Sequence, residues 1–211
     1  MCGKRWAGGF ARVDRRSRLL RIIPRGGVGA ECGVFEGQFS RVLWRRCRPR
    51  RLFLVDTWGA VVKMRRPWRV GGAVCWSEVV GGGDPALAKV AEWAGRPGRQ
   101  NRVEVLRRDS VAWLRSLPAG SLDWVYLDSD HTFAHVSAEL AAAAVAVRPG
   151  GWLLGHDWGE VLPGVTAAVS EFVWRTGRAV DFLTAEKPVP VWPRRDWMPA
   201  WAAFDSWAVR V

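Results

Sequence analysis

Short runs of apolar residues alternate along this chain with segments whose apolar residues recur every three or four positions. Runs without polar alternation, such as Leu52-Phe53-Leu54-Val55, are typical of parallel strands covered on both faces. The predicted strands are 28–34, 52–55, 102–106, 122–127, 152–154, 179–184 and 206–211, and the predicted helices are 13–23, 38–46, 85–93, 110–117, 133–147 and 165–176. Strand and helix alternate, which predicts an α/β fold: a doubly wound, mostly parallel seven-stranded sheet with helices on both faces.

Two segments interrupt this alternation. Residues 57–83 are rich in Gly, Arg and Trp, and we expect an irregular insertion there. Because it follows the strand at 52–55, it starts at the carboxyl edge of the sheet and could form a lid. The Pro-rich stretch 187–199 is expected to connect the last two strands.

The composition is that of a globular protein, with 49% hydrophobic and 25% charged residues in 211. This length suits one domain spanning residues 1–211. No apolar run is long enough to cross a bilayer, and no apolar stretch follows the N-terminal charges as it would in a secretory signal. The four cysteines form no CxxC pair, so we expect free thiols and a cytoplasmic location.

Charge is distributed unevenly along the chain. Residues 1–115 hold 25 Lys and Arg against 9 Asp and Glu, whereas residues 116–211 hold 7 against 11. A basic half could attract nucleic acid or an anionic substrate. An arginine-biased genome would give the same excess on an ordinary solvated surface, since 28 of the 32 basic residues are Arg. The sequence leaves both interpretations open.

Acidic side chains follow the predicted strands. Because ligands of such sheets bind at the carboxyl ends of the strands, these positions are candidates for a binding site. They are Glu31, Asp56, Asp109, Asp128, Asp130 and Asp157.

The stretch Glu31-Cys32-Gly33-Val34-Phe35-Glu36-Gly37 carries the first chemical signal. Gly33 and Gly37 allow a tight turn and a close approach of the backbone to a ligand, beside the N-terminus of the next helix. The spacing differs from GxGxxG, which argues against an NAD-dependent enzyme. With Asp56 after the second strand, it suits an adenosine ligand whose ribose hydroxyls need a carboxylate acceptor.

Four groups of residues together resemble a known family. The stretches 23–40 with 52–58, 120–133, 147–151 and 155–158 look like motifs of class I S-adenosylmethionine-dependent methyltransferases, in the same order. They are similar to a small bacterial branch related to the antibiotic-sugar (macrocin-type) O-methyltransferases. The resemblance implies a Rossmann-like fold, S-adenosyl-L-methionine as cofactor and methyl transfer to the oxygen of a small molecule.

The resemblance also implies cofactor-binding residues. Glu31 and Gly33 would line the methionine end, with Gly37 in the same turn. Asp56 would hold the ribose, and Asp109 with Ser110 would border the adenine. Alternatively, Asp109 only caps the helix that follows it.

The second half of the predicted site is Asp128-Ser129-Asp130-His131 facing His156-Asp157. Some relatives bind Mg²⁺ here, and Asp128 and Asp157 could supply two ligands. His156 stands where those relatives have an acid, and imidazole suits a softer metal. Alternatively His131, or His156, is a metal-free general base.

Less specific interpretations of these residues stay open as well. His131 could cap a helix beginning at Thr132, and His156 could simply pack; we expect His135 on a helix surface. The predicted catalytic residues are His131, Asp128 and Asp157, with Asp128 also facing the cofactor.

Two basic stretches differ in their expected position. Residues 45–51 connect a helix to the second strand, so they lie at the amino ends of the strands, opposite the cofactor. Residues 65–69 fall in the predicted lid and could contribute cationic and aromatic contacts to the acceptor. We expect a small-molecule acceptor and no membrane; nucleic acid is the less favoured partner, and a homo-oligomer is possible. The competing functions are an NAD-dependent enzyme and a basic protein that binds or modifies nucleic acid.

Overall fold

The structure is a computed structural model. It describes residues 16, 18–59, 62–70, 73–81, 83–160, 162–184, 189–190, 201–202 and 205–211. Within this part of the chain, no helix is long and apolar enough to cross a membrane.

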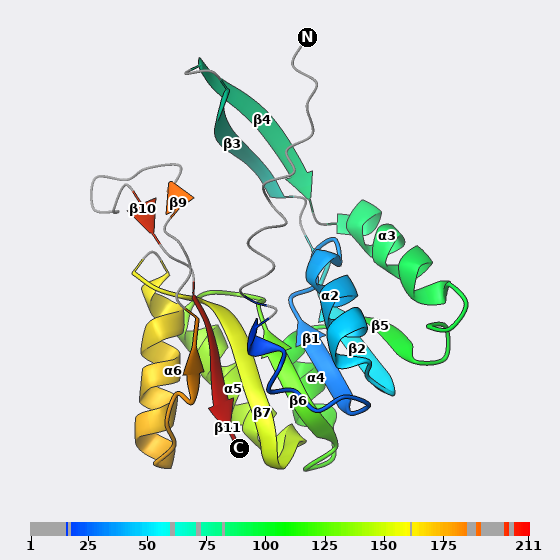
Figure 1. Cartoon of the computed structure of the whole chain (residues 1–211), viewed down its shortest axis with the longest axis vertical. Coiled ribbons are helices and arrows are strands. Elements are labelled where there is room, and N and C mark those ends of the chain that lie inside the picture. The colour runs from blue at the N-terminus through cyan, green and yellow to red at the C-terminus, as the bar shows by residue number, and fades with distance from the viewer. Residues whose placement is uncertain are drawn as a thin grey trace.

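A seven-stranded sheet runs through the middle of the molecule (Figure 1). Its strand order is β5-β2-β1-β6-β7-β11-β8. Neighbours from β5 to β7 are parallel, and β11 is antiparallel to both β7 and β8. The strands are β1 (Val28–Cys32), β2 (Arg51–Asp56), β5 (Val103–Arg107), β6 (Leu122–Leu127), β7 (Val147–Trp158), β8 (Phe182–Leu183) and β11 (Asp205–Arg210). The predicted fold class is confirmed.

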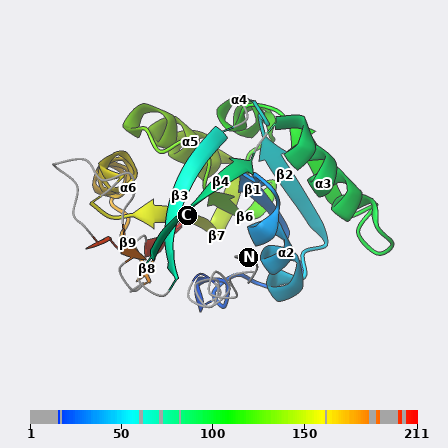
Figure 2. The ribbon, with the colours of Figure 1, turned by 90° about the horizontal axis from the view of Figure 1, so that it is seen from above.

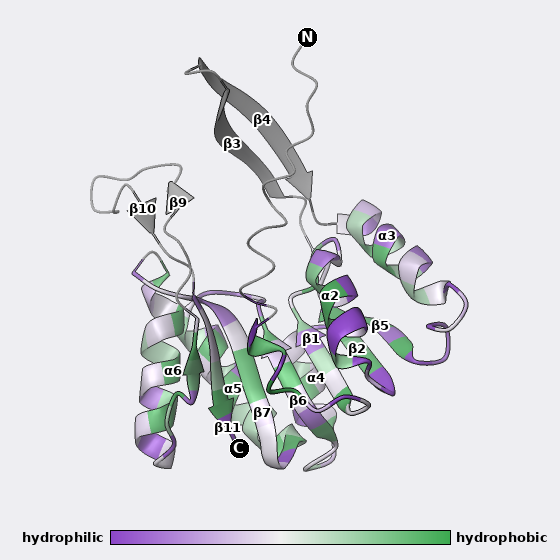
Figure 3. Cartoon of the chain, viewed as in Figure 1, coloured by the Kyte–Doolittle hydropathy of each residue, from purple (hydrophilic) through white to green (hydrophobic). Residues whose placement is uncertain are grey.

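Helices cover both faces of this sheet (Figure 2). They are α2 (Gln38–Cys47), α3 (Gly83–Gly95), α4 (Ser110–Ser116), α5 (Phe133–Ala146) and α6 (Pro163–Thr176). On one face, α4, α5 and α6 pack in a row and share one apolar core with the strands. On the other, α2 and α3 share a second core that also takes in Leu19, Leu20 and Ile23. The strands are mostly apolar, while α2 carries polar residues outward (Figure 3).

The N-terminal helix predicted over 13–23 is shorter where the structure describes it. Residues 13–15 and 17 lie outside the described part, Arg16, Arg18 and Leu19 are helical, and residues 20–23 form a turn and a bend. Leu19 and Leu20 are buried, so this segment is anchored to the sheet. Most of the predicted connection at 187–199 lies outside the described residues; β9 (Val189–Pro190) pairs there with β10 (Trp201–Ala202).

The prediction of an irregular segment at 57–83 is wrong. Two strands, β3 (Val62–Val70) and β4 (Ala73–Gly81), pair antiparallel along their whole length. The hairpin extends away from the seven-stranded sheet (Figure 1). Valines at 62, 70, 74, 79 and 80 favour extended backbone. Pro67 lies in the middle of β3. A proline in a sequence argues against a central strand, but both strands of a two-stranded hairpin are edge strands, which tolerate proline.

Candidate functional site

The turn after β1 brings two strand ends into close contact. Gly33 has φ +88°, a left-handed conformation that favours glycine. A Cβ at this position would stand 2.0 Å from the carbonyl oxygen of Asp128, so only glycine allows the backbones after β1 and β6 to approach this closely. Gly37, at φ +72°, is the N-cap residue of α2. The predicted turn therefore lies directly beside the predicted catalytic segment.

Asp56 holds the backbone of that turn. Its Oδ2 accepts hydrogen bonds from the backbone N–H groups of Val34 and Phe35, both at 2.9 Å. Its Oδ1 accepts one from Trp58 N at 2.7 Å, and the Trp58 indole donates to the Phe35 carbonyl at 2.9 Å. A carboxylate has about four acceptor sites. Asp56 thus orders the glycine turn and keeps capacity for one further donor, such as a ribose hydroxyl.

Glu31 lies deeper than a ligand-contacting residue usually does. Its side chain is 1% exposed and accepts a hydrogen bond from the Ser40 hydroxyl of α2. Burial raises the pKa of Glu31 to about 8, so the carboxyl is largely protonated at neutral pH in this state. The hydrogen bond between Ser40 and Glu31 connects the end of β1 to α2, beneath the surface where a cofactor would lie.

Asp109 and Ser110 begin α4. The Asp109 carboxylate accepts from Ala112 N at 2.8 Å, so Asp109 is the N-cap, as the alternative interpretation predicted. The Ser110 hydroxyl donates to Glu139 of α5 at 2.5 Å, and Ser129 donates to the same carboxylate oxygen at 2.7 Å. Glu139 is 1% exposed. A buried carboxylate therefore connects the start of α4, which follows β5, with the loop after β6.

Beyond the glycine turn lies a cluster of opposite charges. His131 Nε2 lies 2.7 Å from Asp157 Oδ2 and 3.9 Å from Asp128 Oδ1. His156 Nδ1 lies 2.8 Å from the other Asp157 oxygen. Arg16, far away in the sequence, pairs with Asp128 Oδ2 at 3.1 Å. The three predicted catalytic residues, Asp128, His131 and Asp157, are thus brought together.

These contacts change the ionisation of the cluster. The carboxylates of Asp128 and Asp157 raise the pKa of His131 to about 10, against the smaller opposing effect of burial. Burial acts to raise the pKa of Asp157, but His131 and His156 together hold it below its usual range. In this state His131 is an imidazolium at neutral pH. A base role for its ring therefore requires that the pairing with the carboxylates first be weakened.

The edge also holds strained backbone. Phe35, Trp58 and Asp157 have φ of 53°, 41° and 62°, a region that residues other than glycine rarely adopt. Each lies just after β1 or β2, or at the end of β7. Such strain persists only where the surrounding structure imposes it, and it is concentrated at functional sites.

Asp128, His131 and Asp157 also satisfy the distance requirement of a metal site. Among the described residues they are the group of three or more potential ligands whose atoms all lie within 4.8 Å of one another. A small cavity of about 10 Å³ adjoins this group, and its lining includes Asp128 and His131 together with Ser129, Glu139 and His156.

The structure also decides between the interpretations of the histidines. Thr132, not His131, is the N-cap of α5, which begins at Phe133. His135, expected on a helix surface, lies on α5 with its side chain 25% exposed, and it also contacts two polar groups, 3.2 Å from Ser110 Oγ and 3.5 Å from Glu139. Glu139 raises the pKa of His135. His135 therefore belongs to the buried network around Glu139.

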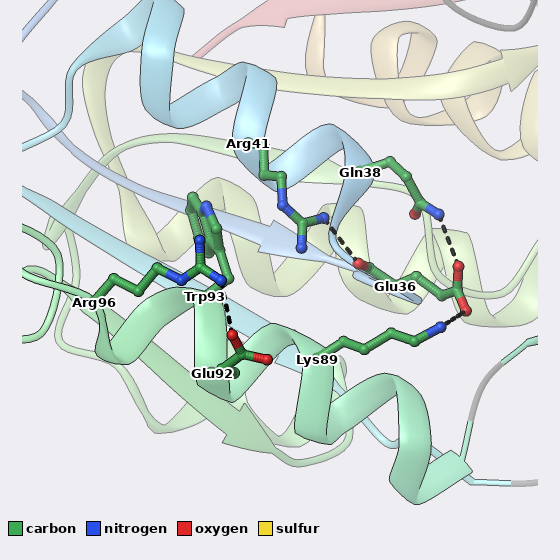
Figure 4. A pocket seen from close by; sticks show the side chains of 7 residues that line it. All are labelled: Glu36, Gln38, Arg41, Lys89, Glu92, Trp93 and Arg96. Carbon is green, nitrogen blue, oxygen red and sulfur yellow. Dashed lines mark hydrogen bonds and ion pairs between the residues drawn. The ribbon is translucent and has the colours of Figure 1, made fainter.

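A separate pocket lies between α2 and α3 (Figure 4). It has a volume of about 240 Å³ and is lined by Glu36, Gln38, Arg41, Lys89, Glu92, Trp93 and Arg96. Four of its charged side chains are paired with one another: Lys89 with Glu36 at 2.8 Å and Arg96 with Glu92 at 2.7 Å. Arg41 donates to the backbone carbonyl oxygens of Glu36 and Gly37. It holds none of the predicted site residues.

The basic stretch 45–51 lies at the amino ends of the strands, as predicted. Arg45 and Arg46 in the last turn of α2 are exposed, as are Arg48 and Arg50 between α2 and β2. The residues 65–69 fall within β3. Their contribution to acceptor binding stays a prediction.

Sequence reasoning missed Arg16, Ser40, Trp58 and Glu139. A buried glutamate four residues after a histidine on an Ala-rich helix looks like an ordinary i, i+4 pair. Ser40, three positions after Gly37, could have been noticed as a partner for Glu31. Nothing in the sequence pairs Arg16 with Asp128, since 112 residues separate them.

Comparison with known proteins adds the family. Residues 30–158, more than half of the chain, match the family model described as "Methyltransferase domain". The matched part holds every predicted site residue. No curated protein matches the sequence at a significant level.

Solved structures share the fold at low sequence identity. A precorrin-6y C5,15-methyltransferase from Geobacter metallireducens has 10% identity and a TM-score of 0.62, covering 100% of this chain and 93% of its own. The precorrin-8w decarboxylase from Methanobacterium thermoautotrophicum has 13% identity and a TM-score of 0.59, with 99% and 92% covered. A putative methyltransferase from Streptococcus mutans, in complex with SAH, has 9% identity and a TM-score of 0.58, with 94% and 97% covered.

One of these neighbours is a decarboxylase, so the fold alone does not determine the reaction. The family model, which matches residues 30–158 by sequence, identifies a methyltransferase domain. The chain belongs to the methyltransferase domain family and is an S-adenosylmethionine-dependent methyltransferase.

Proposed function

We propose that this enzyme transfers the methyl group of S-adenosylmethionine to an oxygen of a small molecule. The observation that carries the proposal is the juxtaposition of the glycine turn with the cluster of Asp128, His131 and Asp157. An oxygen acceptor must lose a proton during transfer, and this cluster holds carboxylate and imidazole groups that exchange protons. The resemblance to the antibiotic-sugar branch supports the same class of acceptor.

The cofactor would lie along the ends of β1, β2 and β6. The donor supplies a methyl group on a positively charged sulfonium. Asp56 would accept a ribose hydroxyl through its remaining acceptor site, and the Gly33 turn would leave room for the backbone to approach the methionine part. Asp109 and Ser110, fixed by the cap and by Glu139, would border the adenine.

Asp128 would face the sulfonium. A cation beside Asp128 would weaken the attraction of this carboxylate for His131, and the pKa of the ring would fall. A neutral His131, still oriented by Asp157, could then accept the proton of an acceptor hydroxyl. Donor binding would thus prepare the base, and the transfer itself would rest on alignment of the two substrates.

Titration calorimetry tests the cofactor part of the proposal. We expect S-adenosylhomocysteine to bind, while NAD⁺ and a generic DNA duplex at moderate salt do not. Failure of S-adenosylhomocysteine to bind at millimolar concentration would contradict the proposal.

The acceptor class needs a separate experiment. Labelled S-adenosylmethionine should methylate hydroxyl compounds such as sugars or small phenols, and bulk RNA or DNA should stay unlabelled. Acidic groups at the carboxyl edge repel phosphate, and the exposed arginines of residues 45–51 lie at the other end of the strands. Label in nucleic acid that disappears in Asp128→Ala would replace the small-molecule acceptor with a nucleic acid.

A further inference from the structure

Arg16 reaches the centre of the proposed catalytic cluster. Its Nη1 lies 3.1 Å from Asp128 Oδ2, and its Nη2 lies 2.5 Å from His156 Nδ1. The guanidinium carbon lies 5.5 Å from the centre of the Phe39 ring. The Arg16 side chain is 24% exposed, against 19% for Asp128. This is a largely enclosed ion pair between two segments that are remote in the sequence.

The fold fixes this arginine in place. Leu19, Leu20 and Ile23, which follow it in the chain, are at most 4% exposed. They belong to the same apolar core as Tyr126 of β6 and Leu154 of β7. Arg16 is therefore held over the strands whose ends carry Asp128 and Asp157.

Asp128 and Asp157, which the resemblance matches to Mg²⁺ ligands of some relatives, already lie against cationic or hydrogen-bonding groups of this chain. Asp128 pairs with Arg16, and Asp157 lies against His131 and His156. A guanidinium has five N–H donors and no acceptor, so it cannot ligate a metal and repels one. His156 stands where those relatives have an acid, and a hard cation binds its imidazole nitrogen poorly. These residues do not fit Mg²⁺.

We propose that Arg16 is the resident cation of this site, supplying beside Asp128 the positive charge that a divalent metal supplies in some relatives. The wild-type site accordingly excludes divalent cations. Removal of the guanidinium leaves Asp128, His131 and Asp157 with potential ligand atoms within 4.8 Å of one another, and so opens this group to a metal ion. The inference rests on the proposed position of the catalytic site, but not on any assumption about the acceptor.

The test is a titration of the protein with Mn²⁺ in the absence of donor and acceptor. Calorimetry measures the heat of binding, and the electron paramagnetic resonance signal measures the Mn²⁺ that stays free. Mn²⁺ accepts both carboxylate and imidazole ligands. We expect no binding to the wild type at millimolar Mn²⁺. Arg16→Gln should bind Mn²⁺ roughly tenfold or more tightly than the wild type, because a neighbouring positive charge has been removed. The double variant Arg16→Gln with Asp128→Asn should lose that binding.

Two matched variants separate the site from general charge effects. Arg18→Gln removes the same charge from an exposed position two residues along, and it should behave as the wild type. Arg16→Lys retains a cation and should still exclude Mn²⁺. Thermal unfolding without metal confirms that each variant is folded.

Two results would overturn the proposal. One is an Arg16→Gln variant, folded by that criterion, that binds Mn²⁺ no better than the wild type. The other is tight Mn²⁺ binding by the wild type, a result that does not depend on whether any variant folds. Neither result depends on methyl transfer, so failure of this inference is distinct from failure of the proposed function, which S-adenosylhomocysteine binding reports.

Discussion

Replacing Gly33 with alanine should damage both the fold and the site. The added methyl group would stand 2.0 Å from the Asp128 carbonyl oxygen and 2.5 Å from Ser129 N. Real contacts of this kind need more than 3 Å, so the backbones after β1 and β6 must separate by about 1 Å or more. The backbone hydrogen bond from Asp128 N to the Cys32 carbonyl oxygen, 2.8 Å in the wild type, joins the same two strand ends and would be lengthened.

The size of the effect follows from two contributions. Placing an alanine at φ +88° costs about 1–2 kcal/mol. Overpacking of a close backbone contact costs about 1–3 kcal/mol more. We therefore expect the free energy of unfolding to fall by about 2–5 kcal/mol. Since Asp128 is displaced, the affinity for S-adenosylhomocysteine should fall as well.

Gly98 provides the matched control. It has φ +83°, but a Cβ there would meet no atom within 4 Å. Gly98→Ala should therefore lose only the conformational contribution of about 1–2 kcal/mol. Urea unfolding of the wild type and both variants measures the difference. If Gly33→Ala is destabilised no more than Gly98→Ala, the close approach of the two strand ends has no energetic importance and the reasoning is refuted.

Two further predictions concern acids of the site. Asp56→Ala leaves three backbone donors without their carboxylate and should weaken S-adenosylhomocysteine binding by about 1–3 kcal/mol in calorimetry. Asp84→Ala, which removes an exposed ion pair to Arg107, is the control; equal effects would contradict the role of Asp56. Glu31 is protonated in the fold up to about pH 8 but ionised in the unfolded chain above about pH 4.5. The unfolded state then binds fewer protons, so this contribution to stability should fall by about 1.4 kcal/mol per pH unit between those values. Urea unfolding at several pH values should show a weaker decline for Glu31→Gln, and an unchanged decline would show that Glu31 is ionised in the fold.

The sheet and its functional edge were predictable because each strand carries its own signal. Continuous apolar runs marked the buried strands, and an acid after each run marked the carboxyl edge. Asp56 and Asp128 could thus be assigned to the same edge of the sheet, at the ends of the strands on either side of β1, without any knowledge of contacts. The resemblance then supplied the cofactor, which no periodicity could have given.

The partners of those acids were not predictable, because they come from remote parts of the chain. Glu139 lies on a helix whose pattern indicates only an apolar face, yet its carboxylate accepts hydrogen bonds from the hydroxyl groups of Ser110 and Ser129. The β3–β4 hairpin was missed for a different reason. Its Gly, Arg and Trp content and Pro67 concealed a strand pattern that only pairing with a second segment stabilises.

The positions of the acids in this site and the groups that neutralise them are set by different parts of the chain. The strand ends fix where Asp128 and Asp157 stand, because the register of β1, β6 and β7 leaves them no other position. The groups that neutralise these acids come from outside that register, from Arg16 and His131. A change of the neutralising group alters the need for metal and the state of the base without moving a strand. We therefore expect the exclusion of divalent cations to depend on Arg16 in the N-terminal segment rather than on the sheet.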